Sequence, residues 1–290
     1  MLAFSGCLDV PALPIAWTGM DAIGRSVVLA HGGAAIAVAC NEQKSVRAVL
    51  AGDICNARQL RTALAGRHAL SGRDDAEVLV HLYEERGVQC VKALRGAFAL
   101  ALWDQRLQRL LLARDQLGLV PLYYVADGGR LAAASSMPPL LAIPGLAGTW
   151  DATALDAFLT LGCVPPPATF YTGIRQLGPG ELAVWEGGRI LTQRYWQLTF
   201  PERRMARPDV PGLLREQTLE ALRMRQAGNV SGLLLSGGLD AAALLALAAS
   251  DRRLPARAYT AVLDGENADD VRDAARLAAR AGVEHVAVQA

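Results

Sequence analysis

Short apolar runs, each bounded by turn residues, fill the first half of the chain and predict strands. The predicted strands are residues 27–36, 46–51, 97–103, 110–114, 121–125 and 130–134. Residues 127–129 (DGG) lie between the last two strands and are typical of a hairpin turn. Strands that follow one another so closely indicate antiparallel pairing.

Two helices are predicted between these strands. The first covers residues 56–66, with Asn56 as a plausible N-cap. The second covers about residues 74–86, where apolar side chains recur at helical spacing, and Gly87 can end it in the left-handed conformation. Dense strands beside two helices predict an α+β layered domain over residues 1–148.

We interpret residues 149–210 as a connecting segment. Asp151 can cap a short helix, and three consecutive prolines at 165–167 forbid that helix from continuing. A hairpin is predicted over residues 182–195, and the polar stretch that follows predicts a linker.

From residue 211 the pattern alternates between helix and strand periods. Three helices are predicted, over residues 212–227, from the turn at 236–238 to about 249, and over 268–281. Three strands are predicted, over residues 230–235, 257–263 and 285–289. After the first helix this order is βαβαβ, which predicts a parallel sheet with right-handed crossovers. Residues 211–290 therefore predict an α/β unit.

Composition excludes several classes of function. The net charge of +1 is scattered over 290 residues, so no basic face for nucleic acid is expected. No apolar run approaches the ~20 residues that span a bilayer, and the start of the chain lacks the basic region of a signal peptide, so we expect a cytoplasmic protein without membrane contact. The five cysteines form no CxxC pair and the four histidines no HExxH pattern, so neither a disulfide nor a metal site is predicted from spacing.

The clearest candidate for chemistry is the segment 236–240 (SGGLD), which follows an apolar strand and opens a helix. Gly237 and Gly238 let backbone N–H groups turn toward a ligand, and the N-terminus of a helix favours a phosphate group. Asp240 is placed to reach Mg²⁺, which prefers oxygen ligands. The alternative interpretation is an ordinary turn with Ser236 or Asp240 as the helix cap.

Several segments together resemble the asparagine synthetase family. Residues 236–240 match its SGGxDS signature, with Ala241 in place of the final serine. The other matching segments, in the family's order, are residues 94–99 (LRGAFA), 114–124 (RDQLGLVPLYY), 162–165 (GCVP) through 177–180 (LGPG), and 194–196 (RYW). The resemblance covers about residues 48–290, whereas the first 45 residues match poorly.

This resemblance implies two domains. Residues 1–148 resemble a class II glutamine amidotransferase with an Ntn-hydrolase fold. Residues 211–290 resemble the first part of an ATP-pyrophosphatase domain with an adenine-nucleotide-hydrolase-like (PP-loop) fold, which is incomplete here. In the family the second domain uses ATP and Mg²⁺ to convert a carboxylate to an acyl-adenylate, and ammonia from the first domain attacks it. The ATP- or pyrophosphate-binding residues implied are Leu234, Ser236, Gly237, Gly238, Leu239, Asp240, Ala241 and Val262, with Asp240 reaching Mg²⁺ through the phosphates.

The glutaminase half departs from the family at its centre. The family begins Met-Cys-Gly, where the cysteine is the nucleophile and its own α-amino group is the base. Leu2 stands at that position, so no catalytic residue is expected in this site. Gly52, Asp53 and Asp75 match a vestigial glutamine-binding set, in which Ala51 replaces an asparagine. Asp75 is alternatively an acid at a helix N-terminus, stabilised by the helix dipole.

Three functions follow as alternatives. By resemblance the chain is an enzyme, an ATP-dependent carbon–nitrogen ligase of the glutamine-hydrolysing asparagine synthase type, whose synthetase domain a separate chain or further sequence would complete. A lasso-peptide cyclase or β-lactam synthetase would fit the lost nucleophile, because a substrate amine replaces ammonia there. A catalytically inactive scaffold is the third alternative. The expected substrate is a small-molecule or peptide carboxylate, and a homodimer is left open.

Overall fold

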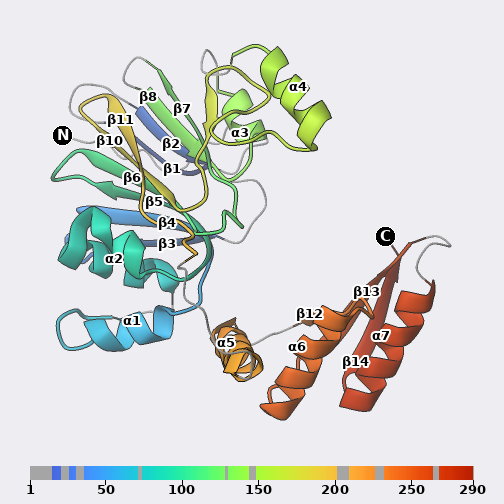
Figure 1. Cartoon of the computed structure of the whole chain (residues 1–290). Helices are drawn as coiled ribbons and strands as arrows, with labels where there is room; N and C mark the ends of the chain where they lie inside the picture. The colour runs from blue at the N-terminus through green and yellow to red at the C-terminus, as the bar shows by residue number, and fades with distance from the viewer. Residues whose placement is uncertain are drawn as a thin grey trace. The chain divides into compact units, whose positions relative to one another are not determined.

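The computed structural model describes residues 15–20, 26–30, 36–70, 74–127, 130–143, 148–200, 209–225, 232–263 and 268–289. The chain divides into two compact units, Met1–Thr199 and Phe200–Ala290 (Figure 1). None of the helices in the described residues is both long and apolar enough to cross a membrane.

A six-stranded antiparallel sheet lies at the centre of the first unit, in the order β11-β10-β6-β5-β4-β3. Its strands are β3 Ile36–Cys40, β4 Val46–Ile54, β5 Gly96–Asp104, β6 Arg109–Arg114, β10 Glu181–Glu186 and β11 Arg189–Arg194. The strands predicted over 46–51, 97–103 and 110–114 are confirmed, and β10 and β11 form the predicted hairpin.

Strand β5 shows why this sheet is buried on both faces. Successive side chains of a strand point to opposite faces, so an unbroken apolar run supplies two cores at once. Phe98 and Leu100 join the core beneath the helices, whereas Ala99 and Trp103 join the core that faces the second sheet.

The second sheet of this unit has five strands in the order β1-β2-β8-β7-β9. Strands β2 and β8 are parallel and the other pairs are antiparallel. The strands are β1 Ile15–Met20, β2 Ser26–Ala30, β7 Tyr123–Asp127, β8 Arg130–Ala134 and β9 Ile174–Gln176. The strand predicted over 27–36 corresponds to β2 and the first residue of β3, and residues 31–35 lie outside the described residues, as do 128–129 of the predicted turn.

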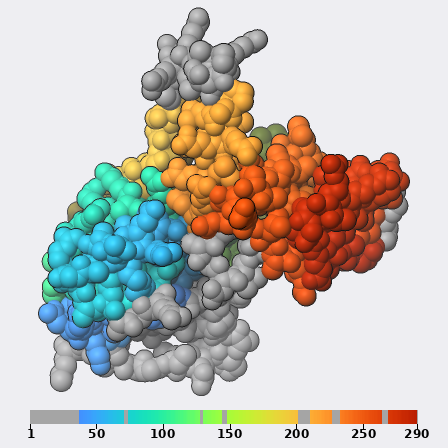
Figure 2. Space-filling model, turned by 90° about the horizontal axis from the view of Figure 1, so that it is seen from below, coloured from blue at the N-terminus to red at the C-terminus, as the bar shows by residue number. Residues whose placement is uncertain are grey.

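Helices cover the outer face of the central sheet, and a short helix at residues 138–141 packs against the second sheet, giving helix, sheet, sheet and helix layers (Figure 1). The helices of this unit are α1 Ala57–Leu64, α2 Asp75–Arg86, the 3-10 helix η1 Gly87–Ala93, α3 Pro138–Leu141 and α4 Ala152–Leu161. In the space-filling view α1 and α2 form one continuous light-blue to turquoise surface (Figure 2). The predicted α+β, Ntn-hydrolase-like layering is confirmed.

The helix ends follow their predictions except at Asn56. The Asp74 carboxylate accepts a hydrogen bond from the Ala76 N–H at the start of α2, and Gly87 ends that helix with φ +55°. Asn56 precedes α1, but its side chain makes no capping bond. It donates instead to the Ala93 carbonyl and accepts from the Arg95 N–H. Asn56 therefore occupies the predicted N-cap position without a side-chain cap, and it joins α1 to the end of η1.

Buried Asp115 holds the crossover between the two sheets. It follows β6 at the end of one sheet, and β7 of the other sheet begins eight residues later. Its carboxylate accepts hydrogen bonds of 3.0–3.3 Å from the backbone N–H groups of Phe98, Leu117, Leu119 and Val120. One side chain therefore fixes the loop against the neighbouring strand.

Arg114 plays the complementary role with carbonyl groups. Its guanidinium donates to the Val120, Leu177 and Gly118 carbonyls at 2.9, 2.8 and 2.6 Å. Leu177 lies between β9 and β10, another place where the chain passes from one sheet to the other. The two residues that open the matched segment 114–124 thus have a structural role.

The segment 149–199 lies within the first unit. Asp151 caps α4 by accepting from the N–H groups of Thr153 and Ala154, as predicted. Beyond it, β9 pairs with β7, β10 pairs with β6 and β11 pairs with β10, so this segment contributes one strand to the second sheet and two to the central sheet.

The second unit is a three-stranded parallel sheet in the order β12-β13-β14, as the βαβαβ pattern predicts. Its elements are α5 Asp209–Arg225, β12 Gly232–Leu234, α6 Leu239–Ser250, β13 Arg257–Val262, α7 Ala268–Ala281 and β14 Glu284–Gln289. Leu245 of α6 and Ala274 of α7 share a single apolar core with Ala258 of β13, so both helices cover the same face of the sheet.

We expect Asp115→Ala to lower the free energy of unfolding by about 3–5 kcal/mol, because the change removes a buried charge and leaves its donors without an acceptor. Urea unfolding followed by tryptophan fluorescence measures this directly, since Trp103 and Trp185 lie in the core between the two sheets.

Asp127→Ala is the matched control. Asp127 is exposed, and among the described residues its carboxylate pairs with nearby Arg130, so its removal should cost about 0–1 kcal/mol. Equal losses in the two variants would show that Asp115 does not hold the crossover.

Candidate phosphate loop and the remnant glutamine site

The loop between β12 and α6 is positioned by the buried end of its strand. Leu235 is 1% exposed, and its N–H donates to the Tyr259 carbonyl at 2.8 Å, extending the parallel pairing by one bond. The chain then turns through residues 236–238 and enters α6 at Leu239. The turn therefore lies where the carboxyl ends of parallel strands meet the start of a helix.

The two glycines of this loop have different roles. Gly237 has φ +80°, and a Cβ atom there would lie 2.5 Å from the Asp270 backbone carbonyl oxygen of α7. Gly238 has φ −72° and ψ 164°, and its nearest neighbour for an added Cβ is the Ser236 hydroxyl at 3.4 Å. Only Gly237 requires glycine, both for backbone conformation and for the close approach of α7.

No side chain among the described residues caps α6. The N-cap position is Gly238, and the Ser236 hydroxyl accepts only a long 3.4 Å bond from the Gly238 N–H. The interpretation of Ser236 or Asp240 as the helix cap is therefore wrong. The first-turn N–H groups of α6 have no side-chain acceptor in this part of the chain and suit an anion.

A buried hydroxyl supports the loop from the neighbouring strand. Thr260 Oγ1 lies 2.5 Å from the Leu235 carbonyl oxygen and 2.8 Å from His285 Nε2. The threonine has a single hydroxyl proton, which it donates to the carbonyl, so His285 Nε2 donates its own proton to Thr260. Threonine and histidine together fix the residue that precedes the loop.

The predicted nucleotide-binding residues lie at one edge of the sheet, and they differ in how exposed they are. Leu234 and Leu239 are 81% and 84% exposed, and Asp240 is also exposed. Val262 is half-buried at the end of β13, the strand next to β12. Ala241 is half-buried and packs against the apolar core of the unit.

The vestigial glutamine residues lie around the end of β4. Gly52 has φ +93°, and a Cβ atom there would lie 2.1 Å from the Ala97 carbonyl oxygen, so only glycine fits. Asp53 is exposed, and Asp75 of α2 accepts a 3.0 Å hydrogen bond from the Ile54 N–H. Ala51 is buried, and Leu2 lies outside the described residues.

Burial raises the pKa of the Asp75 carboxyl, and the Ile54 N–H opposes that effect only in part. The negative charges of Asp53 and Asp74 raise this pKa further, and Arg61 lowers it. Asp75 is thus more than a dipole-stabilised acid at the start of a helix, because it ties α2 to β4.

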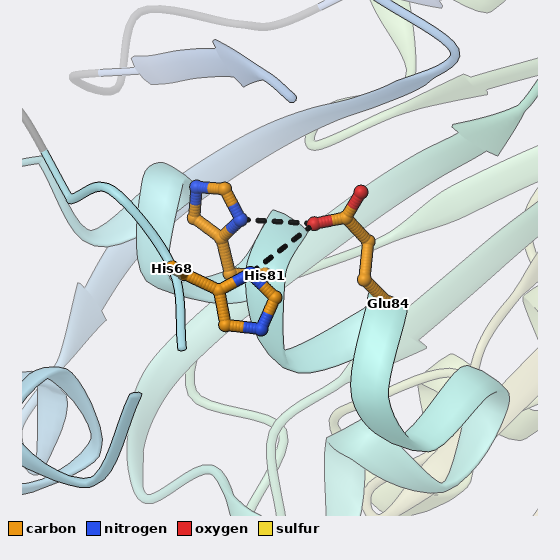
Figure 3. Close-up of side chains that lie close together, drawn as sticks. All are labelled: His68, His81 and Glu84. Atoms are coloured by element: carbon orange, nitrogen blue, oxygen red, sulfur yellow. Dashed lines mark hydrogen bonds and ion pairs between the residues drawn. The ribbon is translucent and has the colours of Figure 1, made fainter. Parts of the chain in front are cut away.

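One group of side chains was not foreseen from sequence spacing. His68, His81 and Glu84 lie together, with one Glu84 oxygen facing a nitrogen of each histidine (Figure 3). The available sequence signal was the His81-x-x-Glu84 spacing, which places both residues on one face of α2. His68 lies in the connection before that helix, 13 residues before His81. Sequence spacing alone does not predict that it meets the other two side chains.

The pKa of Glu84 reflects opposing effects. Burial raises it, but hydrogen bonds from Asn41 and His81 and the charges of His81 and His68 outweigh burial, so the pKa is lowered overall. Glu84 therefore favours its carboxylate form.

Two family models match the chain. The "Glutamine amidotransferase domain" model matches residues 27–196, more than half of the chain, and the "Asparagine synthase" model matches residues 213–290.

Curated relatives agree with these matches. "Asparagine synthetase [glutamine-hydrolyzing] 3" of Bacillus subtilis (strain 168) is 30% identical over 75% of this chain and 36% of its own length. A putative glutamine-hydrolysing asparagine synthetase of Mycobacterium bovis is 31% identical over 82% of this chain and 38% of its own length. "Amidase chry2" of Gibberella zeae is 29% identical over 70% and 31%. The chain thus spans about a third of the length of the curated relatives it matches.

Among solved structures, glutamine phosphoribosylpyrophosphate amidotransferase from B. subtilis, complexed with ADP and GMP, is 19% identical. The structural match covers 87% of this chain and 47% of the amidotransferase chain, with a TM-score of 0.37. This likeness is too weak to carry an argument about function. The family matches and the relatives carry the assignment: the chain belongs to the asparagine synthetase family, with a glutamine amidotransferase domain followed by part of an asparagine synthase domain.

Proposed function

We propose that this chain supplies the nucleotide-binding loop of an ATP-dependent amide-bond-forming ligase. The observation that carries the proposal is the loop 236–240, which opens α6 without a side-chain cap at the end of a parallel strand. Uncapped N–H groups and the positive end of the helix dipole suit a pyrophosphate group.

The residues around the loop fit Mg²⁺·ATP. The N–H groups of Leu239 and Asp240 would face the phosphates, and the exposed Asp240 carboxylate would hold Mg²⁺. Leu234 and Val262, at neighbouring strand ends, would contact the nucleotide base or sugar. Bound ATP would supply the activation of a carboxylate by adenylation. The substrate class is a small-molecule or peptide carboxylate.

The remainder of the synthetase domain would cover the open face of the sheet. Ala258 and Thr260 are buried toward the helices, so the alternate residues of β13 point away from them. Leu234 and Val288 lie in register with these alternate residues on the neighbouring strands, so their side chains share that open face. Leu234 is 81% exposed and Val288 is 49% exposed. Parallel sheets are normally covered on both faces, so we expect further sequence or a separate chain to pack here.

We further propose that the glutaminase half does not hydrolyse glutamine. Ala51 is 7% exposed and apolar at the position where the family has a polar amide, so a hydrogen bond to substrate is lost there. An amine of the substrate would then replace ammonia, as in a lasso-peptide cyclase or β-lactam synthetase.

A scaffold function is the second candidate. Ala241 packs against the core of its unit, which suggests that the position now serves packing instead of phosphate binding. The binding experiments below separate the two functions.

We expect Ala241→Ser to strengthen binding of Mg²⁺·pyrophosphate about 10- to 100-fold, because it restores a hydroxyl donor to a charged group. Isothermal titration calorimetry on the full chain measures the change. A control titration with Mg²⁺ alone separates cation binding from phosphate binding. Unchanged affinity would remove the proposed role of position 241.

Gly237→Ala should weaken the same binding, because its methyl group would meet the Asp270 carbonyl oxygen and displace the loop. Gly282→Ala is the matched control: Gly282 has φ +72° with no neighbour within 4 Å of an added Cβ. Both variants bear the strain of a left-handed alanine, about 1–2 kcal/mol. If both variants bind Mg²⁺·pyrophosphate as tightly as the parent chain does, the loop is only a turn.

Asp75→Asn should stabilise the chain at neutral pH relative to the parent. The pKa of Asp75 is raised in the folded state. Its contribution to the free energy of unfolding is therefore fully present below the unfolded-state pKa and is lost as the pH rises through the folded-state pKa. Asparagine keeps an oxygen acceptor for Ile54 and carries no charge. Urea unfolding at pH 4 and pH 7 should show the stability difference growing with pH, and a difference independent of pH would contradict this.

A further inference from the structure

The strongest group of side chains outside the proposed site is the one formed by His68, His81 and Glu84. We propose that these three residues bind a divalent transition-metal ion of the zinc class in the first unit. Imidazole and carboxylate together suit zinc and its neighbours better than Mg²⁺ or Ca²⁺, which prefer oxygen ligands alone.

The ligand atoms already converge (Figure 3). His81 Nδ1 lies 2.9 Å and His68 Nδ1 lies 3.7 Å from the same Glu84 carboxylate oxygen, Oε2. Zinc bonds of 2.0–2.2 Å in tetrahedral geometry put ligand atoms about 3.4 Å apart. The two observed separations lie on either side of that value, and the candidate ligand atoms of all three residues lie within 4.8 Å of one another. Small side-chain rotations therefore suffice to enclose an ion.

Surrounding groups orient the ligands as they do at metal centres. His68 Nε2 lies 3.3 Å from Glu85 Oε1, so with a metal ion bound the Nε2 proton would face that carboxylate and leave Nδ1 as the ligand atom beside Glu84. A carboxylate behind a coordinating histidine is the usual arrangement for fixing its tautomer.

The other Glu84 oxygen is held as well. Asn41 Nδ2 donates to Glu84 Oε1 at 2.8 Å, which leaves Oε2 for the two histidines. Asn41 is fixed in turn, because its Oδ1 accepts from the N–H groups of Ser45 and Val46 at 2.8 and 3.1 Å.

Burial shields the site and leaves a route to it. The His81 side chain is 3% exposed, and those of His68 and Glu84 are each 18% exposed. Three protein ligands leave one position of a tetrahedral ion open for water or another small ligand. The competing possibility is a metal-free network in which His81 and Glu84 merely tie α2 to its neighbours.

The test uses the purified full chain, stripped with a chelator and titrated with Zn²⁺ and with Co²⁺. We expect the chain to retain one zinc ion after dialysis and the Co²⁺ form to show visible absorption of a four-coordinate site without a thiolate charge-transfer band. Failure of the parent chain to retain zinc or to develop this spectrum would overturn the proposal.

Two ligand variants test the assignment. His68→Gln and Glu84→Gln should each raise the Kd for zinc by at least about 100-fold, since each removes a direct ligand, and Glu85→Gln should raise it about 10- to 100-fold. Glu84→Gln retains an oxygen for Asn41, and circular dichroism of the metal-free variants establishes that they fold. Folded variants that bind zinc as tightly as the parent would rule out the site.

Two control variants test whether zinc binds elsewhere on the first unit. Glu186→Gln removes an equally charged, exposed residue that is paired with Arg109, and it should leave zinc binding unchanged. Cys40→Ser should also leave it unchanged, although Cys40 is an exposed thiol beside Asn41. Loss of zinc in Cys40→Ser would assign the metal to that thiol and contradict the proposal.

Discussion

The first unit depends on two buried, charged side chains at the point where the chain leaves one sheet for the other. Asp115 gathers backbone N–H groups from β5 and from the following loop, and Arg114 gathers carbonyl groups from that loop and from Leu177. The connections from β6 to β7 and from β9 to β10 thereby share one network. Since buried charges are tolerated only when they are satisfied, the network leaves little freedom in how the two sheets are connected.

Two glycines near the candidate sites are required by backbone packing alone. Gly52 is required by the close approach of the Ala97 carbonyl, and Gly237 by the approach of α7. These glycines serve the backbone whether or not a ligand binds. The family resemblance leads us to expect polar side chains at positions 51 and 241, whereas Ala51 is buried and Ala241 packs against an apolar core.

Local patterns allowed most of the architecture to be predicted. The apolar run over 97–103 became β5, and Gly87 ends α2 where the sequence predicted the helix to end. Long-range partners could not be predicted in the same way. The amide of Asn56 finds its partners at Ala93 and Arg95, almost 40 residues away, instead of capping α1. The meeting of His68 with α2 is likewise set by the path of the connecting chain, which leaves no periodic signal.

We propose that the loop after β12 offers its backbone N–H groups to a pyrophosphate. Hydrogen–deuterium exchange of the full chain, with and without Mg²⁺·pyrophosphate, tests this at the amides themselves. We expect slower exchange confined to residues 236–242 on addition of Mg²⁺·pyrophosphate, with no change in the remaining α6 amides. Unchanged exchange in this loop at saturating pyrophosphate would show that it does not bind the ligand.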